Sequence, residues 1–309
     1  MLTASQSVPR SPELGSQGSE RSDTTEPLPW QLAEETETKA YVDFCDAAPA
    51  GVRKLLGIRS ARVGGSLALS IRRDPSQFFN RVGAFDESEP INSALLASVA
   101  NFYRSQNVEQ ASFMIAPRLL PLDWDDIAQS RNLTEGTRFV KLYSAVAKAA
   151  AVSGDNEGLA PDLQVRSVEP HETREWADVM MTTFGFTAPG MSSMAAACPG
   201  RPNWRCYGVW DGSRIVAVAS MFINGQCADM FGAATLPEYR GRGAQSALLA
   251  VRAAEAQNIG CRWLLAETWS ESPGSYNTSL RNMKRVGFQE MYERVSWRWS
   301  AEKVNRLGP

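Results

Sequence analysis

The chain has 309 residues, of which 43% are hydrophobic and 21% charged, and its formal net charge is −2. This composition is ordinary for a globular protein of about two domains, and it gives no global positive field that would attract nucleic acid. No apolar run approaches the roughly 18 residues needed to cross a bilayer, and the N-terminus lacks the basic start and apolar core of a secretory signal. We therefore expect a cytoplasmic protein without a membrane segment.

Cysteine and histidine residues are few and scattered along the chain. The five cysteines form no CxxC pair, and His171 is the single histidine. Scattered thiols are typical of a reducing compartment, and a zinc site needs several such ligands at short spacings. We expect neither a disulfide framework nor a bound metal.

Two segments of low hydrophobicity divide the sequence. Residues 1–33 are rich in Ser, Pro, Gly, Thr and Glu, so they cannot bury enough surface to offset chain entropy. Residues 151–163, AVSGDNEGLAPDL, are the second such segment. We predict a disordered tail over 1–33, an N-terminal domain over 34–150, a linker over 151–163 and a C-terminal domain over 164–303.

The N-terminal domain shows the order strand, helix, strand, helix, strand. Its first helix places Ile91, Leu95, Val99 and Phe102 on one face. The predicted elements are strand 76–85, helix 90–105, strand 111–117, helix 123–133 and strand 137–144. The same order recurs in the second half of the chain, so we interpret this domain as a degenerate internal repeat.

The C-terminal domain begins with a strand and helical segments, followed by three strands close together in sequence. Asp211-Gly212 and Asn224-Gly225 are hairpin signals between these strands, which must therefore be antiparallel neighbours. The predicted elements are strand 163–168, helix 171–185, a helical or irregular stretch around 191–200, strands 205–210, 214–223 and 226–235, a helix from 244, strand 261–269, helix 275–288 and strand 292–300.

The helix from 244 connects strand 226–235 to strand 261–269. A crossover of this kind predicts that the two strands run parallel. The whole order predicts an α+β fold, in which a mixed, mostly antiparallel sheet is flanked by helices.

The sequence PEYRGRGAQSALL, residues 237–249, joins the last of the three strands to this helix. A helix start leaves several N–H groups without partners, and Gly241 and Gly243 let the backbone approach a ligand closely. Together with Arg240 and Arg242, these groups suit a phosphate or pyrophosphate. The motif is not a P-loop, because it lacks GxxxxGK[ST], and its glycines are too close for a dinucleotide fingerprint.

These residues resemble the pyrophosphate loop of the GCN5-related N-acetyltransferases, the GNAT superfamily, which reads [QR]-x-x-G-x-[GA]. The corresponding residues are Arg240-Gly241-Arg242-Gly243-Ala244-Gln245, with Gln245 where the family usually has a small residue. The strand order and a helix end containing Asn282, Gly287 and Phe288 add to the resemblance, which covers about 163–300 and extends more weakly to the first domain. It implies two tandem GNAT-like domains, of which the first is degenerate.

The resemblance implies acetyl-CoA or another acyl-CoA as co-substrate and an amine of a small molecule or peptide as acceptor. In the family, the loop holds the coenzyme pyrophosphate and the strand end pairs with the pantetheine arm. The cofactor-binding residues implied here are Ala233, Ala234, Thr235, Arg240, Gly241, Arg242, Gly243, Ala244, Gln245, Asn277 and Asn282. For Asn277 and Asn282 the alternative is a capping or stabilising role in their helix.

The resemblance also suggests catalytic candidates. Asp229 lies where some family members place a glutamate general base, and Glu267 is a second carboxylate on the next strand. Asp229 could instead belong to the polar face of its strand. The tyrosine that often protonates the leaving thiolate corresponds to Met283 here, and Tyr276 and Ser279 are nearby substitutes. We take Asp229, Glu267 and Tyr276 as the catalytic candidates.

The matching loop of the first domain carries Asp86, Glu87 and Glu89. Carboxylates at this position would repel a pyrophosphate. We therefore expect the first domain to bind no coenzyme and to shape the acceptor cleft or an oligomer.

Two alternative functions remain open. A charged tRNA as acyl donor would use the basic residues of the first domain, Arg53, Lys54, Arg59, Arg62, Arg72 and Arg73. A non-catalytic acyl-CoA-binding module would explain why the usual tyrosine is missing.

Overall fold

The computed structural model describes residues 27–152, 158–272 and 274–301. Residues 1–26 of the predicted tail and 153–157 of the predicted linker lie outside the described residues. No described helix is both long and apolar enough to cross a membrane.

In the described part of the chain, twelve strands form one sheet in the order β1-β2-β3-β4-β12-β5-β11-β9-β8-β7-β6, with β10 paired to β8. The strands are β1 (Ile58–Val63), β2 (Ser66–Ile71), β3 (Arg81–Gly83), β4 (Gln110–Met114), β5 (Leu133–Ala145), β6 (Leu163–Ser167), β7 (Trp204–Asp211), β8 (Arg214–Asn224), β9 (Cys227–Asp229), β10 (Ala234–Thr235), β11 (Trp263–Trp269) and β12 (Gln289–Ser300). The β3–β4 and β9–β11 pairs are parallel and the other described pairs are antiparallel. This arrangement confirms the predicted fold class.

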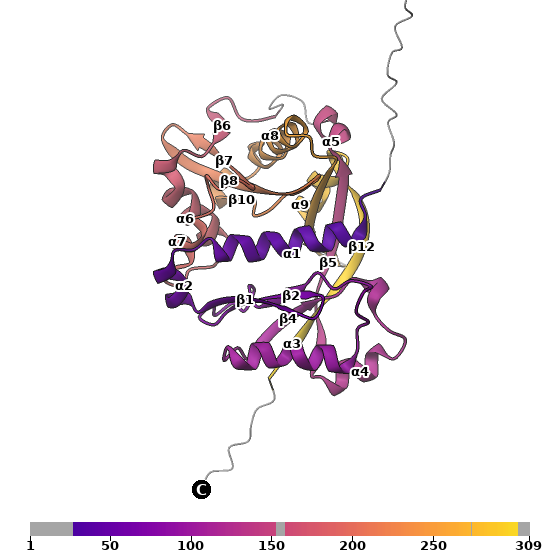
Figure 1. Cartoon of the computed structure of the whole chain (residues 1–309). Helices are drawn as coiled ribbons and strands as arrows, with labels where there is room; N and C mark the ends of the chain where they lie inside the picture. The colour runs from indigo at the N-terminus through magenta and orange to yellow at the C-terminus, as the bar shows by residue number, and fades with distance from the viewer. Residues whose placement is uncertain (1–26, 153–157, 273, 302–309) are drawn as a thin grey trace, which may run out of the picture.

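Helices cover both faces of this sheet. They are α1 (Trp30–Asp46), α2 (Ala50–Leu56), α3 (Ser93–Ser105), α4 (Trp124–Ser130), α5 (Val146–Val152), α6 (Thr173–Thr183), α7 (Met191–Ala195), α8 (Ala244–Asn258) and α9 (Thr278–Arg285), with 3-10 turns at Pro117–Leu119, Pro170–Glu172 and Pro237–Tyr239. One hydrophobic core joins α1, α2, α6 and α7 to the sheet, and separate cores lie beneath α3 and α4 and beneath α5, α8 and α9. In Figure 1, α1 lies between the strands β7, β8 and β10 above it and β1, β2 and β4 below it.

The last strand of each predicted domain lies beside strands of the other domain. β5 pairs with β11 from Trp263↔Ala145 to Trp269↔Phe139, and β12, the final strand of the chain, pairs with both β4 and β5. Each half of the sheet is therefore completed by a strand from the other half. The domain limits 34–150 and 164–303 stay a prediction, and the two segments share one continuous sheet.

Some predicted elements differ from those observed. The predicted strand 76–85 is reduced to β3, because the Asp74 carboxylate accepts hydrogen bonds from the backbone N–H groups of Ser76 (2.9 Å) and Phe79 (3.2 Å) and fixes a turn before the strand. The predicted tail is too long, since α1 already begins at Trp30 and Ala33 is fully buried.

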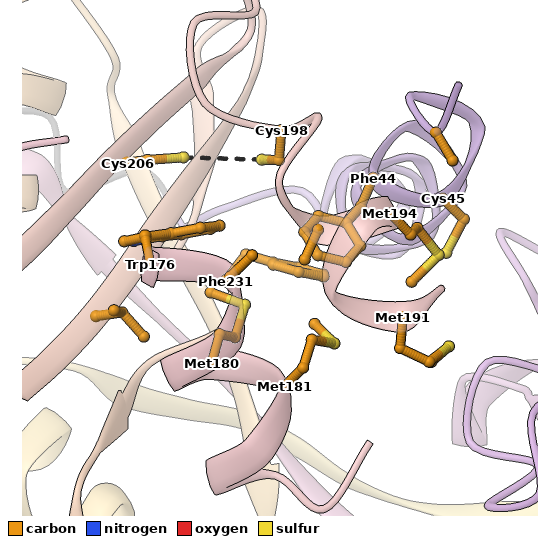
Figure 2. Packing of buried hydrophobic residues seen from close by; sticks show 14 of the residues in the cluster. Phe44, Cys45, Trp176, Met180, Met181, Met191, Met194, Cys198, Cys206 and Phe231 are labelled. Atoms are coloured by element: carbon orange, nitrogen blue, oxygen red, sulfur yellow. Dashed lines mark hydrogen bonds between the residues drawn. The ribbon is translucent and has the colours of Figure 1, made fainter. Parts of the chain in front are cut away.

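The core that joins α1 to the second half of the chain is shown in Figure 2, where Phe44 of α1 lies among side chains of α6 and α7. Phe231 packs against Phe44 and Trp204, with ring centroids 5.0 and 5.2 Å apart. The thiols of Cys198 and Cys206 lie 3.7 Å apart in the same core. This packing holds Phe231, which follows the end of β9, in a fixed position.

Candidate functional site

The sheet divides at the end of β9. The Met230 N–H donates to the Leu265 carbonyl of β11 (2.7 Å). The next N–H group, that of Phe231, donates instead to the Asp229 carbonyl of its own segment (2.9 Å). The predicted strand 226–235 is therefore two short strands, β9 and β10, with a break between them.

Beyond this break the two neighbouring strands take different partners. β10 pairs with β8, whereas β11 continues along β5. In the described ladders no pair joins β10 to β11, so their facing edges are available to an extended ligand.

The loop between β10 and α8 has the geometry that its sequence predicts. Gly241 and Gly243 have φ angles of 77° and 83°, a region that favours glycine. Gly243 is the N-cap of α8 and has no side chain to accept from the first-turn N–H groups. No side-chain cap therefore occupies these groups, and Arg240 and Arg242 lie in the loop directly before them.

The matching loop of the first domain is closed. The N-cap residue of α3, Asn92, accepts hydrogen bonds from the N–H groups of Ala94 and Leu95, both at 2.9 Å. Glu89 accepts from the Gly65 N–H at 2.8 Å and lies against the β1–β2 turn. A side chain thus occupies the helix start that a coenzyme would need.

The described end of the predicted linker packs against the loop. The Ala160 N–H donates to the Arg242 carbonyl at 3.1 Å, and the Arg242 guanidinium forms an ion pair with Asp162 at 2.5 Å. The hydrogen bond from Arg242 lowers the pKa of Asp162. Arg240, by contrast, is exposed, and its guanidinium donates to the Thr235 carbonyl at 3.4 Å.

Gln245, the residue that departs from the family pattern, connects α8 to α9. Its amide nitrogen donates to the Ser279 hydroxyl at 3.1 Å, and its amide oxygen accepts from Asn282 at 2.6 Å. Two of the residues expected to bind the cofactor, Gln245 and Asn282, are therefore hydrogen-bonded to each other.

Asn277 is the N-cap of α9 and is buried. Its side chain accepts from the Leu280 N–H (3.1 Å) and donates to the Trp269 carbonyl (2.6 Å). These contacts match the capping alternative for this residue. Tyr276 is 61% exposed, and the Arg281 guanidinium lies 4.0 Å from its ring centroid.

Asp229 and Glu267, the two candidate carboxylates, lie on adjacent strands beneath α1. Asp229 is only 5% exposed, and burial raises its pKa to about 8. Burial also raises the pKa of Glu267 to about 7, against the opposing effect of Arg294. Asp229 can therefore hold or release a proton near neutral pH, as a general base requires.

A buried ion cluster, formed by Glu34, Glu37, Arg81, Lys141, Glu267 and Arg294, lies next to these carboxylates. Glu34 and Glu37 of α1 approach Arg294 of β12 at 2.7 and 2.5 Å. Although burial opposes ionisation, Arg294 and Lys141 hold the pKa of Glu37 well below its ordinary value.

Sequence reasoning missed this cluster because its members come from one helix and four strands spread over most of the chain. The one local signal is the pair Glu34 and Glu37, which are separated by one helical turn and so share a face.

A cavity of about 310 Å³ adjoins the cluster on the same side of the sheet as α1. Arg81 lines the cavity and its guanidinium also approaches the Glu267 carboxylate at 3.8 Å, so one side chain links the cavity to Glu267. Its other walls include Phe78, Phe139 and Ser112, all from the predicted N-terminal domain. Among the described residues, no three His, Cys, Asp or Glu side chains are grouped to hold a metal ion.

Comparisons with known proteins find a matching family model and similar folds. Residues 171–281 match the model of the acetyltransferase (GNAT) family. A GCN5-related N-acetyltransferase from Kribbella flavida is 15% identical, with a TM-score of 0.54 over 85% of this chain and 97% of that one. A GCN5-related N-acetyltransferase from Sphaerobacter thermophilus is 12% identical, with a TM-score of 0.54 over 89% and 94%.

A tandem GNAT protein from the clavulanic acid biosynthesis pathway is 12% identical, with a TM-score of 0.51 over 89% of this chain and 96% of that one. No curated protein matches the chain. At these identities the structural likeness shows a shared fold, and it extends over both halves of the sheet.

Proposed function

We propose that the chain is a tandem-domain member of the GNAT superfamily and that it transfers an acyl group from acetyl-CoA or a related acyl-CoA to an amine; the match of residues 171–281 to the family model and the shared fold support this proposal. The observation that carries this proposal is the loop of residues 240–245, which opens α8 where β10 and β11 diverge. Two left-handed glycines and an exposed arginine at an uncapped helix start are suited to a pyrophosphate.

In this proposal the coenzyme lies between α8 and the divided strands. The backbone N–H groups from Arg242 to Gln245 and the Arg240 guanidinium bind the pyrophosphate. The exposed edge of residues 233–235 pairs with the pantetheine arm. Gln245 and Asn282 hold α8 and α9 in register beside the arm, as their mutual hydrogen bond indicates.

Asp229 is the proposed general base. It takes a proton from the acceptor nitrogen, whose lone pair then attacks the thioester carbonyl carbon. The carbon–sulfur bond breaks, and the sulfur leaves as a thiolate that is then protonated. Glu267 is already paired with Arg294 and Arg81, so we assign it to positioning. Tyr276, exposed on the segment before α9, is the candidate that remains for protonating the thiolate.

The cavity beside Arg81 is the proposed acceptor site. It is lined by two aromatic rings, Phe78 and Phe139, and by hydroxyl and amide groups. Tyr41 connects it to the strand break, since its ring lies 5.9 Å from Phe78 and 4.9 Å from Phe231. The degenerate domain would then supply the acceptor cleft, in keeping with the expectation from sequence.

Calorimetric titration of the full chain with acetyl-CoA tests the donor. We expect saturable binding that Arg240→Ala weakens by about tenfold or more, because a charge-assisted hydrogen bond is removed. Arg138→Ala is the matched control, since Arg138 is an exposed arginine on β5 outside the loop. Absence of binding, or equal behaviour of the two variants, would overturn the assignment.

A thiol-release assay over a panel of small amines and peptides tests the reaction itself. Acceptor-dependent release of the coenzyme thiol supports transfer. Binding of acetyl-CoA without release for any amine in the panel would favour the non-catalytic alternative.

A further inference from the structure

A second hollow, with a volume of about 640 Å³, lies between α2, β1 and the end of β2. Four of its seven lining residues are cationic, namely Arg53, Lys54, Arg59 and Arg72, and the others are Ala50, Gly57 and Gln106. In Figure 1, α2 and β1 lie at the opposite side of α1 from α8, whose start is the proposed coenzyme loop. We propose that this hollow binds a small molecule that carries a diphosphate or an equivalent group of phosphates.

Two of its arginines are fixed by backbone carbonyl groups. Arg53 donates to the Asp46 carbonyl at 3.1 Å and also approaches the Asp46 carboxylate at 3.4 Å. Arg59 donates to the Ile58 carbonyl at 3.1 Å. A carbonyl orients a guanidinium without neutralising its charge, so these arginines are held in position while the remaining N–H groups stay available.

The position of the third arginine, Arg72, requires a glycine at position 57. Gly57 ends α2 with a φ of 70°, and a Cβ placed there would lie 3.1 Å from Arg72 Cβ and 3.3 Å from Arg72 Nε. The missing side chain lets Arg72 lie across the end of α2. Because the last turn of α2 carries Arg53 and Lys54, this arrangement brings cations from two elements together.

The charges of the hollow are unbalanced. None of the ion pairs in the described ranges involves Lys54, Arg59 or Arg72, and Asp46 offsets one of the four cations. An excess of three positive charges therefore gathers in one hollow of a protein whose net charge is −2. Like charges held close repel one another, and a diphosphate, with about three negative charges, would relieve this repulsion through guanidinium contacts.

A small ligand fits these observations better than RNA. The volume lies within the range of roughly 300–1,000 Å³ that small-molecule sites occupy. The other members of the basic run, Arg62 and Arg73, are exposed but do not line the hollow. Four of the six cations of the run therefore line one hollow, whereas RNA binding uses an extended basic surface.

Titration of the full chain with inorganic pyrophosphate tests the proposal. The Arg240→Ala background weakens any binding at the coenzyme loop, so that the hollow dominates the titration. We expect binding in this background, weakened by about tenfold for each arginine removed in Arg59→Ala and Arg72→Ala. Arg62→Ala is the matched control, because it removes an exposed arginine of the same strand that does not line the hollow, and its affinity should be unchanged.

Acetyl-CoA titration of the Arg59→Ala/Arg72→Ala double variant separates this site from the proposed enzyme function. Unchanged acetyl-CoA binding together with lost pyrophosphate binding supports a second, independent site. The proposal is overturned if pyrophosphate does not bind in the Arg240→Ala background, or if Arg62→Ala weakens it as much as Arg59→Ala. Salt-sensitive binding of tRNA that pyrophosphate fails to displace would also overturn it, in favour of the RNA alternative.

Discussion

The Arg242 guanidinium forms an ion pair with the Asp162 carboxylate at 2.5 Å. Asp162 belongs to the predicted linker and Arg242 to the proposed pyrophosphate loop, so the pair ties one segment to the other. Asp162 thereby engages Arg242, one of the two arginines of the loop. A bound pyrophosphate would therefore compete with Asp162 for Arg242, while Arg240 is free of such competition in the described structure.

Asp162→Ala should strengthen acetyl-CoA binding. The substitution removes the competing carboxylate, and we expect a dissociation constant about two- to fivefold lower at low salt, with a smaller change at high salt. Calorimetric titration at two salt concentrations measures this. Asp178→Ala, which removes a surface ion pair with Arg174 elsewhere, is the control. Weaker binding by Asp162→Ala would instead mean that the pair positions the loop.

Gly243→Ala and Gly241→Ala should differ strongly although both glycines have positive φ. A Cβ at Gly243 would lie 2.0 Å from the Gly158 carbonyl oxygen, whereas a Cβ at Gly241 meets nothing within 4 Å. We expect Gly241→Ala to cost about 1–2 kcal/mol for its left-handed conformation, and Gly243→Ala to cost more and to lose acetyl-CoA affinity as the linker is displaced.

Thermal unfolding and acetyl-CoA titration of the two glycine variants provide the measurement. Equal effects of the two substitutions would show that the contact between the linker and the loop does not matter for either property.

Asp229→Asn should remove the proposed base. Because burial raises the pKa of Asp229 to about 8, its ionised form increases as pH rises through that value, and kcat/KM of the wild type should rise and then level off. The rate of the variant should fall by about 10²–10⁴-fold, and its kcat/KM should no longer rise with pH through this range. A pH–rate profile of both proteins, with Asp178→Asn as control, is the measurement; a limb that persists in Asp229→Asn would exclude the role.

The same carboxyl should make stability depend on pH. The unfolded chain releases this proton near its ordinary pKa of 3.8 and the folded chain near 8, so between these values the folded state loses stability as pH rises. Asp229→Asn lacks this loss. Its stability relative to wild type should increase with pH, by up to about 1.4 kcal/mol per pH unit, when urea unfolding is compared between about pH 5 and pH 7.

Lys141→Met should destabilise the fold. Lys141 is fully buried and pairs with Glu34 and Glu37, and removing one partner of a buried ion cluster leaves charge without compensation, at a cost of about 3–5 kcal/mol. Lys39→Met on α1 is the control, because the pair of Lys39 with Glu35 is solvent-accessible and is worth at most about 1 kcal/mol. Similar free energies of unfolding for the two variants would contradict a stabilising role for the cluster.

Elements with strong local signals were predictable. The hairpins at Asp211-Gly212 and Asn224-Gly225 are present, and β9 and β11 run parallel as the crossover through α8 requires. The N-terminal elements were harder to predict. The β1–β2 hairpin and α1 were not identified. For α1 the reason is an acidic sequence whose buried glutamates are stabilised by partners on distant strands, such as Arg294.

The sequence by itself determined the order of the second half of the chain, the left-handed glycines of the loop and the family resemblance. These depend on residues close together in sequence, where turn chemistry and helix periodicity act. Only the tertiary structure decided that β5 and β12 complete each other's half of the sheet, that Gln245 bonds to Asn282, and that Asp229 lies buried beneath α1. Strand pairing, burial and the pKa shifts that follow from burial depend on which distant segments meet, and no local pattern specifies that.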